Sequence, residues 1–160
     1  MKAAAETMKK VTLELGGKNP AIVFDDCDMD ITLDWTLFAA FANSGQVCSA
    51  GSRIYVQENI YDTFINKYVE ACAKIKIGNG LEEGIHMGPL VSAAHYEKVK
   101  NYIAVGKAEG ATMLCGGERP AHLPEGYFLQ PTVFANTHHN MRIMKEEIFG
   151  PVVCIQKFAT

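Results

Sequence analysis

Residues 21–56 read AIVFDDCDMDITLDWTLFAAFANSGQVCSAGSRIYV, and this stretch decides the fold that the sequence predicts. It opens with a continuous apolar run over residues 21–24, which is typical of a strand buried on both faces. A helix follows that Asp28 or Asp30 can cap, and a second short strand covers residues 54–56. The order strand, helix, strand predicts two parallel strands joined by a crossover helix.

The apolar residues of this helix follow helical spacing, at Ile31, Trp35 and Phe38 with Leu37 and Phe41 beside them. Such spacing is typical of an amphipathic helix that packs its apolar stripe against a core. We therefore expect these residues to form the buried face of the helix.

The alternation of strands and helices continues on both sides of this stretch. Residues 11–15 alternate apolar and polar side chains, which predicts a strand that ends at a glycine pair. Pro131 indicates that its own strand is an edge or irregular one. The whole pattern predicts an α/β fold, a mostly parallel sheet flanked by helices. Helices are expected over residues 60–75 and 92–109, and extended segments over 112–115, 128–134 and 151–158.

Both ends of the chain look like interrupted units. Residues 3–10 have helix-forming residues and a basic terminus but no N-cap residue, as the end of a helix does. The last predicted strand runs almost to Thr160 without a closing helix. We therefore expect the chain to open and to stop in the middle of a structural unit, so that the α/β fold is incomplete at both ends.

The charge balance excludes some classes of partner. The 160 residues hold 15 Lys and Arg against 18 Asp and Glu, a formal net charge of -3, so no nucleic acid partner is expected. No apolar run has the roughly 18 to 20 residues that a membrane span requires, and no signal peptide is recognised. We therefore expect a cytoplasmic protein with no membrane association.

The cysteines and histidines follow no metal-ligand or disulfide pattern. The five cysteines lie at wide, unequal intervals, their number is odd, and no CxxC pair occurs. The histidines show neither HExxH nor any paired spacing. Neither a disulfide framework nor a metal site is therefore expected. The cysteines are Cys27, Cys48, Cys72, Cys115 and Cys154.

The strongest local signal for chemistry is the loop GQVCSAG, residues 45–51. Its small residues would let a ligand approach the backbone, so that the Cys48 sulfur could attack a carbonyl while main-chain N–H groups receive the negative charge on its oxygen. The alternative is that Cys48 is an ordinary small apolar residue in a loop. The other four cysteines have no such loop around them.

A covalent intermediate on a thiol needs a base that activates water, and Glu14 is the candidate. Leu13 and Leu15 flank it just before a glycine turn, and burial there would raise its pKa toward the range of a general base. We expect Glu14 and Cys48 to converge on one cavity. The alternative is a solvated glutamate on the face of a strand.

A third cluster is KEEIFGPV, residues 145–152, where Glu146 and Glu147 are followed by Phe149 and a Gly-Pro turn. Carboxylates of this kind can accept hydrogen bonds from ribose hydroxyls, and an aromatic ring can pack against a flat cofactor. The alternative is an acidic helix end that leads into a turn.

These clusters, LELGGKNP (13–20), GQVCSAG and EEIFGPV, occur in an order and spacing that resemble the NAD(P)-dependent aldehyde dehydrogenase superfamily. The resemblance runs along the whole chain and is specific. GQVCSAGSR and MRIMKEEIFGPVV look most like the betaine aldehyde dehydrogenase branch.

The resemblance implies a role for particular residues. Cys48 would be the nucleophile that forms a thiohemiacetal and then a thioester with an aldehyde, and Glu14 would activate the water that hydrolyses the thioester. NAD or NADP would be the cofactor. The residues that fall on the family's cofactor contacts are Glu147, Phe149, Leu15, Gly16 and Lys98, whereas His95 stands where many relatives have glutamine.

The resemblance also implies that parts of the family's machinery are missing from this chain. In the family the cofactor-binding domain precedes the Glu14 segment, so residues 1–12 would be its remnant and residues 13–160 the thiol-bearing catalytic domain. We therefore expect little or no dehydrogenase activity from the chain alone. The alternatives are a non-enzymatic folded module that self-associates, and a thiol esterase remnant. A small aldehyde as substrate and a homo-oligomer are the expected partners.

Overall fold

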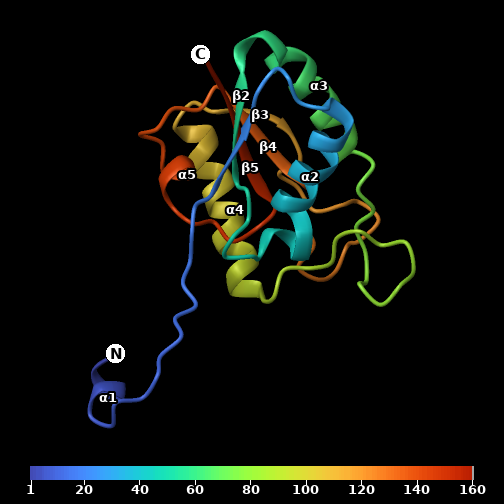
Figure 1. Ribbon diagram of the computed structural model, residues 1–160. Coiled ribbons are helices and arrows are strands. Elements are labelled where there is room, and N and C mark those ends of the chain that lie inside the picture. The colour runs from blue at the N-terminus through green and yellow to red at the C-terminus, as the bar shows by residue number, and fades with distance from the viewer. Residues whose placement is uncertain (160) are drawn as a thin grey trace.

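The computed structural model describes residues 1–159, in which a five-stranded sheet has helices on both faces (Figure 1). The strands lie in the order β1-β2-β5-β4-β3, and the pairs β1–β2, β2–β5 and β5–β4 are parallel, whereas β3 and β4 are antiparallel. The α/β fold with a mostly parallel sheet is therefore confirmed. The elements are α1 (Lys2–Ala5), β1 (Pro20–Val23), α2 (Met29–Phe41), η1 (Ala42–Gly45), β2 (Arg53–Gln57), η2 (Glu58–Ile60), α3 (Tyr61–Cys72), α4 (Ala93–Ala108), β3 (Thr112–Cys115), β4 (Thr132–Ala135), α5 (Arg142–Lys145) and β5 (Val152–Phe158).

The core consists of two hydrophobic clusters, one on each face of the sheet. Successive residues of β5 alternate between them: Val153 and Ile155 belong to the cluster with α2 and α3, and Val152 and Cys154 to the cluster with α4 and α5. Figure 1 shows these helix pairs on opposite sides of the strands. The strand is buried on both sides, which explains why its sequence is a continuous apolar run rather than an alternating one.

Helix α2 begins where the sequence predicts, but it buries a different face. Asp28 caps it, since its Oδ1 accepts hydrogen bonds from the N–H groups of the first turn at 3.0 and 3.1 Å. The predicted buried face is wrong for Trp35 and Phe38, which are 67% and 64% exposed, and for Ile31. Apolar residues surround this helix, so spacing alone did not select a face. The buried positions are Leu33, Thr36, Ala40 and Phe41.

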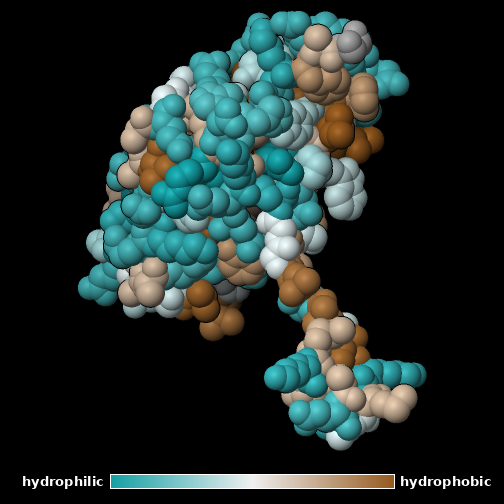
Figure 2. Space-filling model, turned by 90° about the vertical axis from the view of Figure 1, so that its left-hand side faces the viewer, coloured by the Kyte–Doolittle hydropathy of each residue, from teal (hydrophilic) through white to brown (hydrophobic). Residues whose placement is uncertain are grey.

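The strand predicted over residues 11–15 is not present. This segment is irregular and exposed, and it projects from the body of the molecule toward the short helix α1 (Figures 1 and 2). A strand needs a neighbour that supplies ladder hydrogen bonds, and within residues 1–159 none lies beside this segment. The alternation of apolar and polar side chains therefore predicted a strand, but the segment has no neighbouring strand with which to pair in the described chain.

The prediction that Pro131 marks an edge strand is wrong, although the β3–β4 ladder does contain a register shift. Strand β4 lies inside the sheet, and Pro131 directly precedes it. The ladder on the β5 side starts with the Thr132 N–H, which donates to the Pro151 carbonyl at 2.8 Å. The proline therefore lies outside the ladder and removes no hydrogen bond from it.

Candidate active site

The loop that carries Cys48 follows a sharp turn at the end of α2. Asn43, Ser44 and Gly45 have φ angles of 50°, 59° and 70° in succession, which turns the chain back on itself. The Ser44 hydroxyl donates to the Gly88 carbonyl at 2.8 Å, and the Gln46 side chain accepts from a backbone N–H of the same distant segment at 2.9 Å. The turn is thus held by side chains, as unusual backbone conformations at functional sites often are. Cys48 follows it and is exposed.

The segment LGGKNP lies against the backbone of Cys48. The Asn19 side-chain amide donates to the Cys48 carbonyl at 2.9 Å. A Cβ atom on Gly17 would lie 2.7 Å from the same carbonyl oxygen, so the position accommodates only glycine without a shift. Sequence reasoning missed Asn19, although an amide side chain beside a glycine-rich turn is a common partner for loop carbonyls.

Glu147 joins the third cluster to the same place. The Gly17 N–H donates to Glu147 Oε1 at 3.0 Å across 130 residues of sequence. Gly16 packs so closely on this carboxylate that a Cβ atom there would overlap it. Gly45 in turn lies against the carbonyl of Gly150. The three sequence clusters therefore meet in space, with the glycine pair between the cysteine loop and Glu147.

The two adjacent carboxylates have different partners. Glu146 forms an ion pair with Arg142 at 2.8 Å and accepts from the Tyr102 hydroxyl at 2.7 Å. These hydrogen bonds lower the pKa of Glu146 to about 2. Within residues 1–159 Glu147 forms no ion pair of this kind, although Lys18 is close enough to interact with its charge, and Oε2 accepts no hydrogen bond. Only Glu147 therefore has a free carboxylate oxygen at the site.

Phe149 is held in an unusual conformation next to Glu147. Its φ angle is +60°, which is uncommon for a bulky residue. His95 Nε2 on α4 hydrogen-bonds to the Phe149 carbonyl at 2.5 Å, and the two rings meet edge to face with 5.9 Å between centroids. The departure at His95 thus has a structural role here. Lys98, one turn further along α4, is exposed and its Nζ lies 5.9 Å from the Tyr102 ring centroid.

Glu14 does not have the environment that the sequence predicts. It lies in the exposed segment, and Leu15 beside it is 70% exposed. Three extended residues span at most about 11 Å, so Glu14 is near Gly17 along the chain but not enclosed with Cys48. A small cavity where the clusters meet is lined by residues of all three, but neither Glu14 nor Cys48 lines it. The burial expected to raise the pKa of Glu14 is absent from the described part of the chain.

The residues at this site fit a nucleotide ribose. Because Gly16 and Gly17 have no Cβ atom, the carboxylate of Glu147 packs directly on their backbone, and its Oε2 accepts no hydrogen bond within residues 1–159. A carboxylate with a free oxygen matches a ribose diol, which offers two hydroxyl donors. Residues 1–159 contain no cluster of three His, Cys, Asp or Glu that could hold a metal ion. In the same part of the chain, no helix has the length and hydropathy needed to cross a bilayer.

Comparisons with curated proteins find relatives over the whole chain. Betaine aldehyde dehydrogenase, chloroplastic, from Beta vulgaris is 48% identical over 160 residues, which is 100% of this chain and 32% of that protein. Aminoaldehyde dehydrogenase 2, peroxisomal, from Malus domestica is also 48% identical over the same share of each chain. The chain therefore spans about a third of the length of these relatives.

Solved structures give the same result for the fold. The crystal structure of betaine aldehyde dehydrogenase from Staphylococcus aureus in complex with NAD+ is 47% identical, with a TM-score of 0.93 over 99% of this chain and 32% of that one. A mutant aldehyde dehydrogenase from Bacillus cereus is 46% identical with a TM-score of 0.92. The sequence model of the Aldehyde dehydrogenase family matches residues 1–160. The chain belongs to the aldehyde dehydrogenase family.

Proposed function

We propose that this chain is the cysteine-bearing segment of an NAD(P)-dependent aldehyde dehydrogenase. The observation that supports this most directly is the meeting of the Cys48 loop, the Gly16–Gly17 pair and Glu147 at one place. A thiol nucleophile, a backbone cradle and a ribose-binding carboxylate are the parts that such a reaction needs. In this proposal residues 13–160 form the catalytic domain, and residues 1–12 are the remnant end of a cofactor-binding domain.

Cys48 acts as the nucleophile in this proposal. Its thiolate adds to the aldehyde carbon and forms a thiohemiacetal. Within residues 1–159 the backbone N–H groups of Cys48 and Ser49 donate to no other group, so they are available to the oxygen that becomes negative. Asn19 stabilises this arrangement because it holds the Cys48 carbonyl.

Glu147 would bind the nicotinamide ribose through its free oxygen, with Phe149 packing nearby and the backbone at Leu15 and Gly16 beside the ring. Lys98 is the candidate for a further ribose contact. A bound nicotinamide would take up the hydride that leaves the former aldehyde carbon. The Gly17 N–H orients Glu147 for this contact.

Glu14 completes the cycle as the base that activates water. The water attacks the thioester on Cys48, the C–S bond breaks, and a carboxylate leaves with the thiolate regenerated. Glu14 and Cys48 are both exposed in this chain, and hydride transfer requires a site that excludes water. We therefore expect the 160 residues alone to have little dehydrogenase activity.

The substrate class in this proposal is a small aldehyde, with betaine aldehyde as the first candidate. The named relatives act on betaine aldehyde or aminoaldehydes, and the Staphylococcus aureus structure holds NAD+. NAD is therefore the first cofactor to test, and NADP the second. The cytoplasmic location stays a prediction, because the plant relatives are named as chloroplastic or peroxisomal.

A second candidate is a folded module that self-associates, and the exposed face of α2 favours it. Trp35 and Phe38 stack edge to face at 6.0 Å on this face, with Ile31 beside them on the surface. Exposed apolar patches of this kind mark association sites. The homo-oligomer predicted from the sequence would use this face. A thiol esterase remnant is the third candidate, since acyl transfer through Cys48 needs no hydride acceptor.

A chimera tests the dehydrogenase proposal. The corresponding 160 residues of the Beta vulgaris enzyme are replaced by this chain, and NADH formation with betaine aldehyde is measured. The chimera should be active, and Cys48→Ala should lower kcat by a factor of about 10⁴ or more. Cys27→Ala, at a half-buried cysteine outside the Cys48 loop, is the control and should keep activity. A chimera that stays active without Cys48 would overturn the proposal.

The chain alone separates the alternatives. NADH formation, ester hydrolysis and NAD binding are measured for the wild type and for Cys48→Ala. Ester turnover that disappears with Cys48 supports the esterase remnant. A stable oligomer without turnover supports the self-associating module, and NADH formation by the chain alone would contradict our expectation of inactivity.

A further inference from the structure

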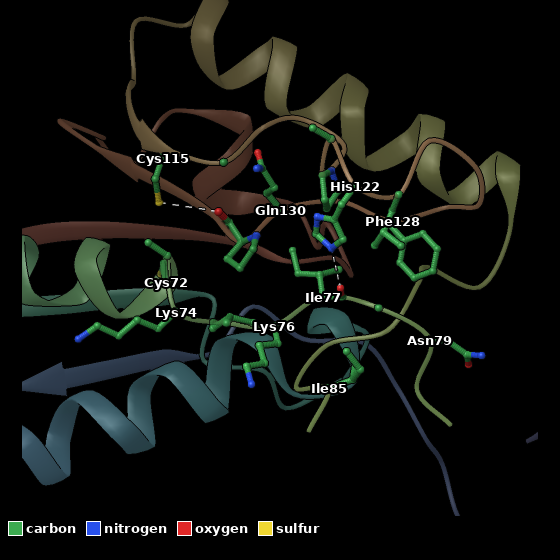
Figure 3. A pocket seen from close by; sticks show the side chains of 18 of the residues that line it. Cys72, Lys74, Lys76, Ile77, Asn79, Ile85, Cys115, His122, Phe128 and Gln130 are labelled. Carbon is green, nitrogen blue, oxygen red and sulfur yellow. Dashed lines mark hydrogen bonds between the residues drawn. The ribbon is translucent and has the colours of Figure 1, made fainter. Parts of the chain in front are cut away.

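A cavity of about 890 Å³ lies apart from the Cys48 loop, between the end of α3 and two long loops (Figure 3). Residues 72–79 form one wall, and residues 115–116, 120–123, 128 and 130–131 contribute to the other. Most of the side chains are apolar, and no residue of the Cys48 loop takes part. None of the residues proposed for aldehyde oxidation lines this cavity, so its chemistry is independent of that reaction.

Two of the five cysteines line this cavity together. Cys72 is the last residue of α3, and Cys115 is the last residue of β3. Helix α3 packs against β3, and Cys115 packs on the core cluster that contains Cys72. Figure 3 shows the Cys115 side chain pointing from its strand toward the helix end that carries Cys72. Two thiols from distant parts of the chain thus share one wall of the cavity.

The two thiols differ in a way that assigns the order of reaction. The neighbouring Cys115 thiol and burial raise the pKa of Cys72, whereas the Cys72 thiol lowers the pKa of Cys115. Cys72 is buried, whereas Cys115 is half-buried. The Cys115 Sγ lies 3.8 Å from the Pro131 carbonyl, which fixes the direction of the side chain. Cys115 is therefore the more accessible thiol of the two, and a molecule in the cavity reaches it first.

We propose that Cys72 and Cys115 form a redox-active dithiol site, which a hydroperoxide entering the cavity oxidises to a disulfide. The Cys115 thiolate attacks the hydroperoxide, forms an S–O bond and breaks the O–O bond, so that an alcohol or water leaves and a sulfenic acid remains. The Cys72 sulfur then attacks the Cys115 sulfur and expels water. In sum, two thiols and one hydroperoxide give one disulfide, one alcohol or water, and one water.

The other cysteines are not arranged for this reaction. Cys154 belongs to the core cluster on the opposite face of the sheet, where Ile143 is its neighbour. Cys48 is exposed in the loop that Asn19 holds. Cys27 packs on the same core cluster as Cys115 but does not line the cavity. Cys27 is therefore the matched control: a half-buried thiol of the same core without a thiol neighbour.

Peptide mapping of the 160-residue chain tests the proposal. The chain is treated with hydrogen peroxide, remaining thiols are blocked with N-ethylmaleimide, and the unreduced chain is digested with trypsin. Cys72 then lies in peptide 68–74 and Cys115 in peptide 108–142, because Arg119 is followed by proline and is not cleaved. We expect these two peptides linked, with an intact mass lower by two hydrogen atoms, and full reversal by dithiothreitol.

Variants show whether the link depends on this pair. Cys72→Ser and Cys115→Ser should each abolish the linked peptides, and Cys27→Ser should leave them unchanged. The proposal is overturned if peroxide links either cysteine to Cys48 or Cys154, or if Cys115 is oxidised to sulfinic acid without any link to Cys72.

A second measurement does not depend on variants that fold. Phenylarsine oxide bridges two thiols only when they are close together, so it is added to the reduced wild type before N-ethylmaleimide. Cys72 and Cys115 should be protected together, with one arsenic per chain by mass. Protection of neither, or of only one of them, would contradict the proposed pair.

Discussion

The chain has two thiol environments that are opposite in construction. Cys48 lies exposed in a loop, and the groups near it are backbone amides and glycines from distant segments. Cys72 and Cys115 line one cavity and belong to the same core packing, so each has a second thiol in its surroundings. The same side chain is therefore suited to attack a carbonyl in one place and to pair with a second thiol in the other. What surrounds the sulfur, not the residue type, decides between these chemistries.

The largest expected effect is in the rate of alkylation. Cys48 should react with iodoacetamide at least about 100-fold faster than Cys72 or Cys154, because buried thiols react only after local opening. Mass spectrometry of the labelled peptides over time measures these rates. Cys48→Ala should remove the fast phase. A fast phase that survives this substitution would show that exposure does not separate the two environments.

The next effect concerns the backbone contact that supports Cys48. In Gly17→Ala the new Cβ atom would lie 2.7 Å from the Cys48 carbonyl oxygen, so the backbone must shift. We expect a loss of about 1 to 3 kcal/mol in the free energy of unfolding, measured with urea. Gly80→Ala is the matched control, since nothing lies within 4 Å of a Cβ atom there. Equal effects of the two substitutions would refute the tight contact.

The third effect is a pH dependence of the free energy of unfolding that arises from Cys154, the buried thiol that neither site uses. Burial raises the pKa of Cys154 to about 11, from the ordinary thiol value of 9.0 that applies in the unfolded chain. The stability that this burial contributes is complete below pH 9 and is lost as the pH rises to about 11, on the order of 2 kcal/mol. Urea unfolding between pH 8 and about 11 should show a flatter decline for Cys154→Ala than for the wild type. If the free energy of unfolding fell equally with pH in the wild type and in Cys154→Ala, the predicted contribution of Cys154 would be contradicted.

The smallest effect is expected at the carboxylate that joins the clusters. Glu147→Gln keeps an oxygen that accepts from Gly17, but it removes the charge of that hydrogen bond, at a cost of about 1 kcal/mol in the free energy of unfolding. The free energy of NAD binding should decrease by more than the free energy of unfolding does. Glu146→Gln, which disturbs an exposed ion pair instead, is the control and should not weaken NAD binding. If Glu146→Gln weakened NAD binding more than Glu147→Gln does, the ribose contact would belong to Glu146.

Much of the fold was predictable because its signals are local. The Asp28 cap and the apolar run of β5 are properties of a few neighbouring residues, and both were found where the sequence indicated. The apolar run of β1 also forms a strand, but the predicted burial on both faces is wrong, because β1 lies at the edge of the described sheet and Ile22 and Phe24 are 59% and 53% exposed. The predictions that failed are those that depend on which segments lie next to one another. Residues 11–15 alternate like a strand, but they have no neighbouring strand within the described chain. The exposed side of α2 could not be chosen, since both sides are apolar.

The site shows the same division. Its candidate residues could be named from the sequence, since glycines around a cysteine and a pair of carboxylates before an aromatic are visible in the letters. The contacts between these residues could not be predicted. The hydrogen bond from Gly17 to Glu147 joins residues 130 positions apart, and Asn19 was not singled out at all. The pairing of Cys72 with Cys115 was equally hidden, because one lies on a helix and the other on a strand.

The letters alone determined the family resemblance, the α/β class and the residue types available for chemistry, because these depend on short-range order and composition. Tertiary packing decided which of two adjacent glutamates keeps a free oxygen, which face of α2 meets the core, and which cysteines are neighbours. Those outcomes depend on contacts between distant segments, which the strand order of the sheet brings together. Local preference cannot specify them, since the same side chain has different neighbours in each possible arrangement.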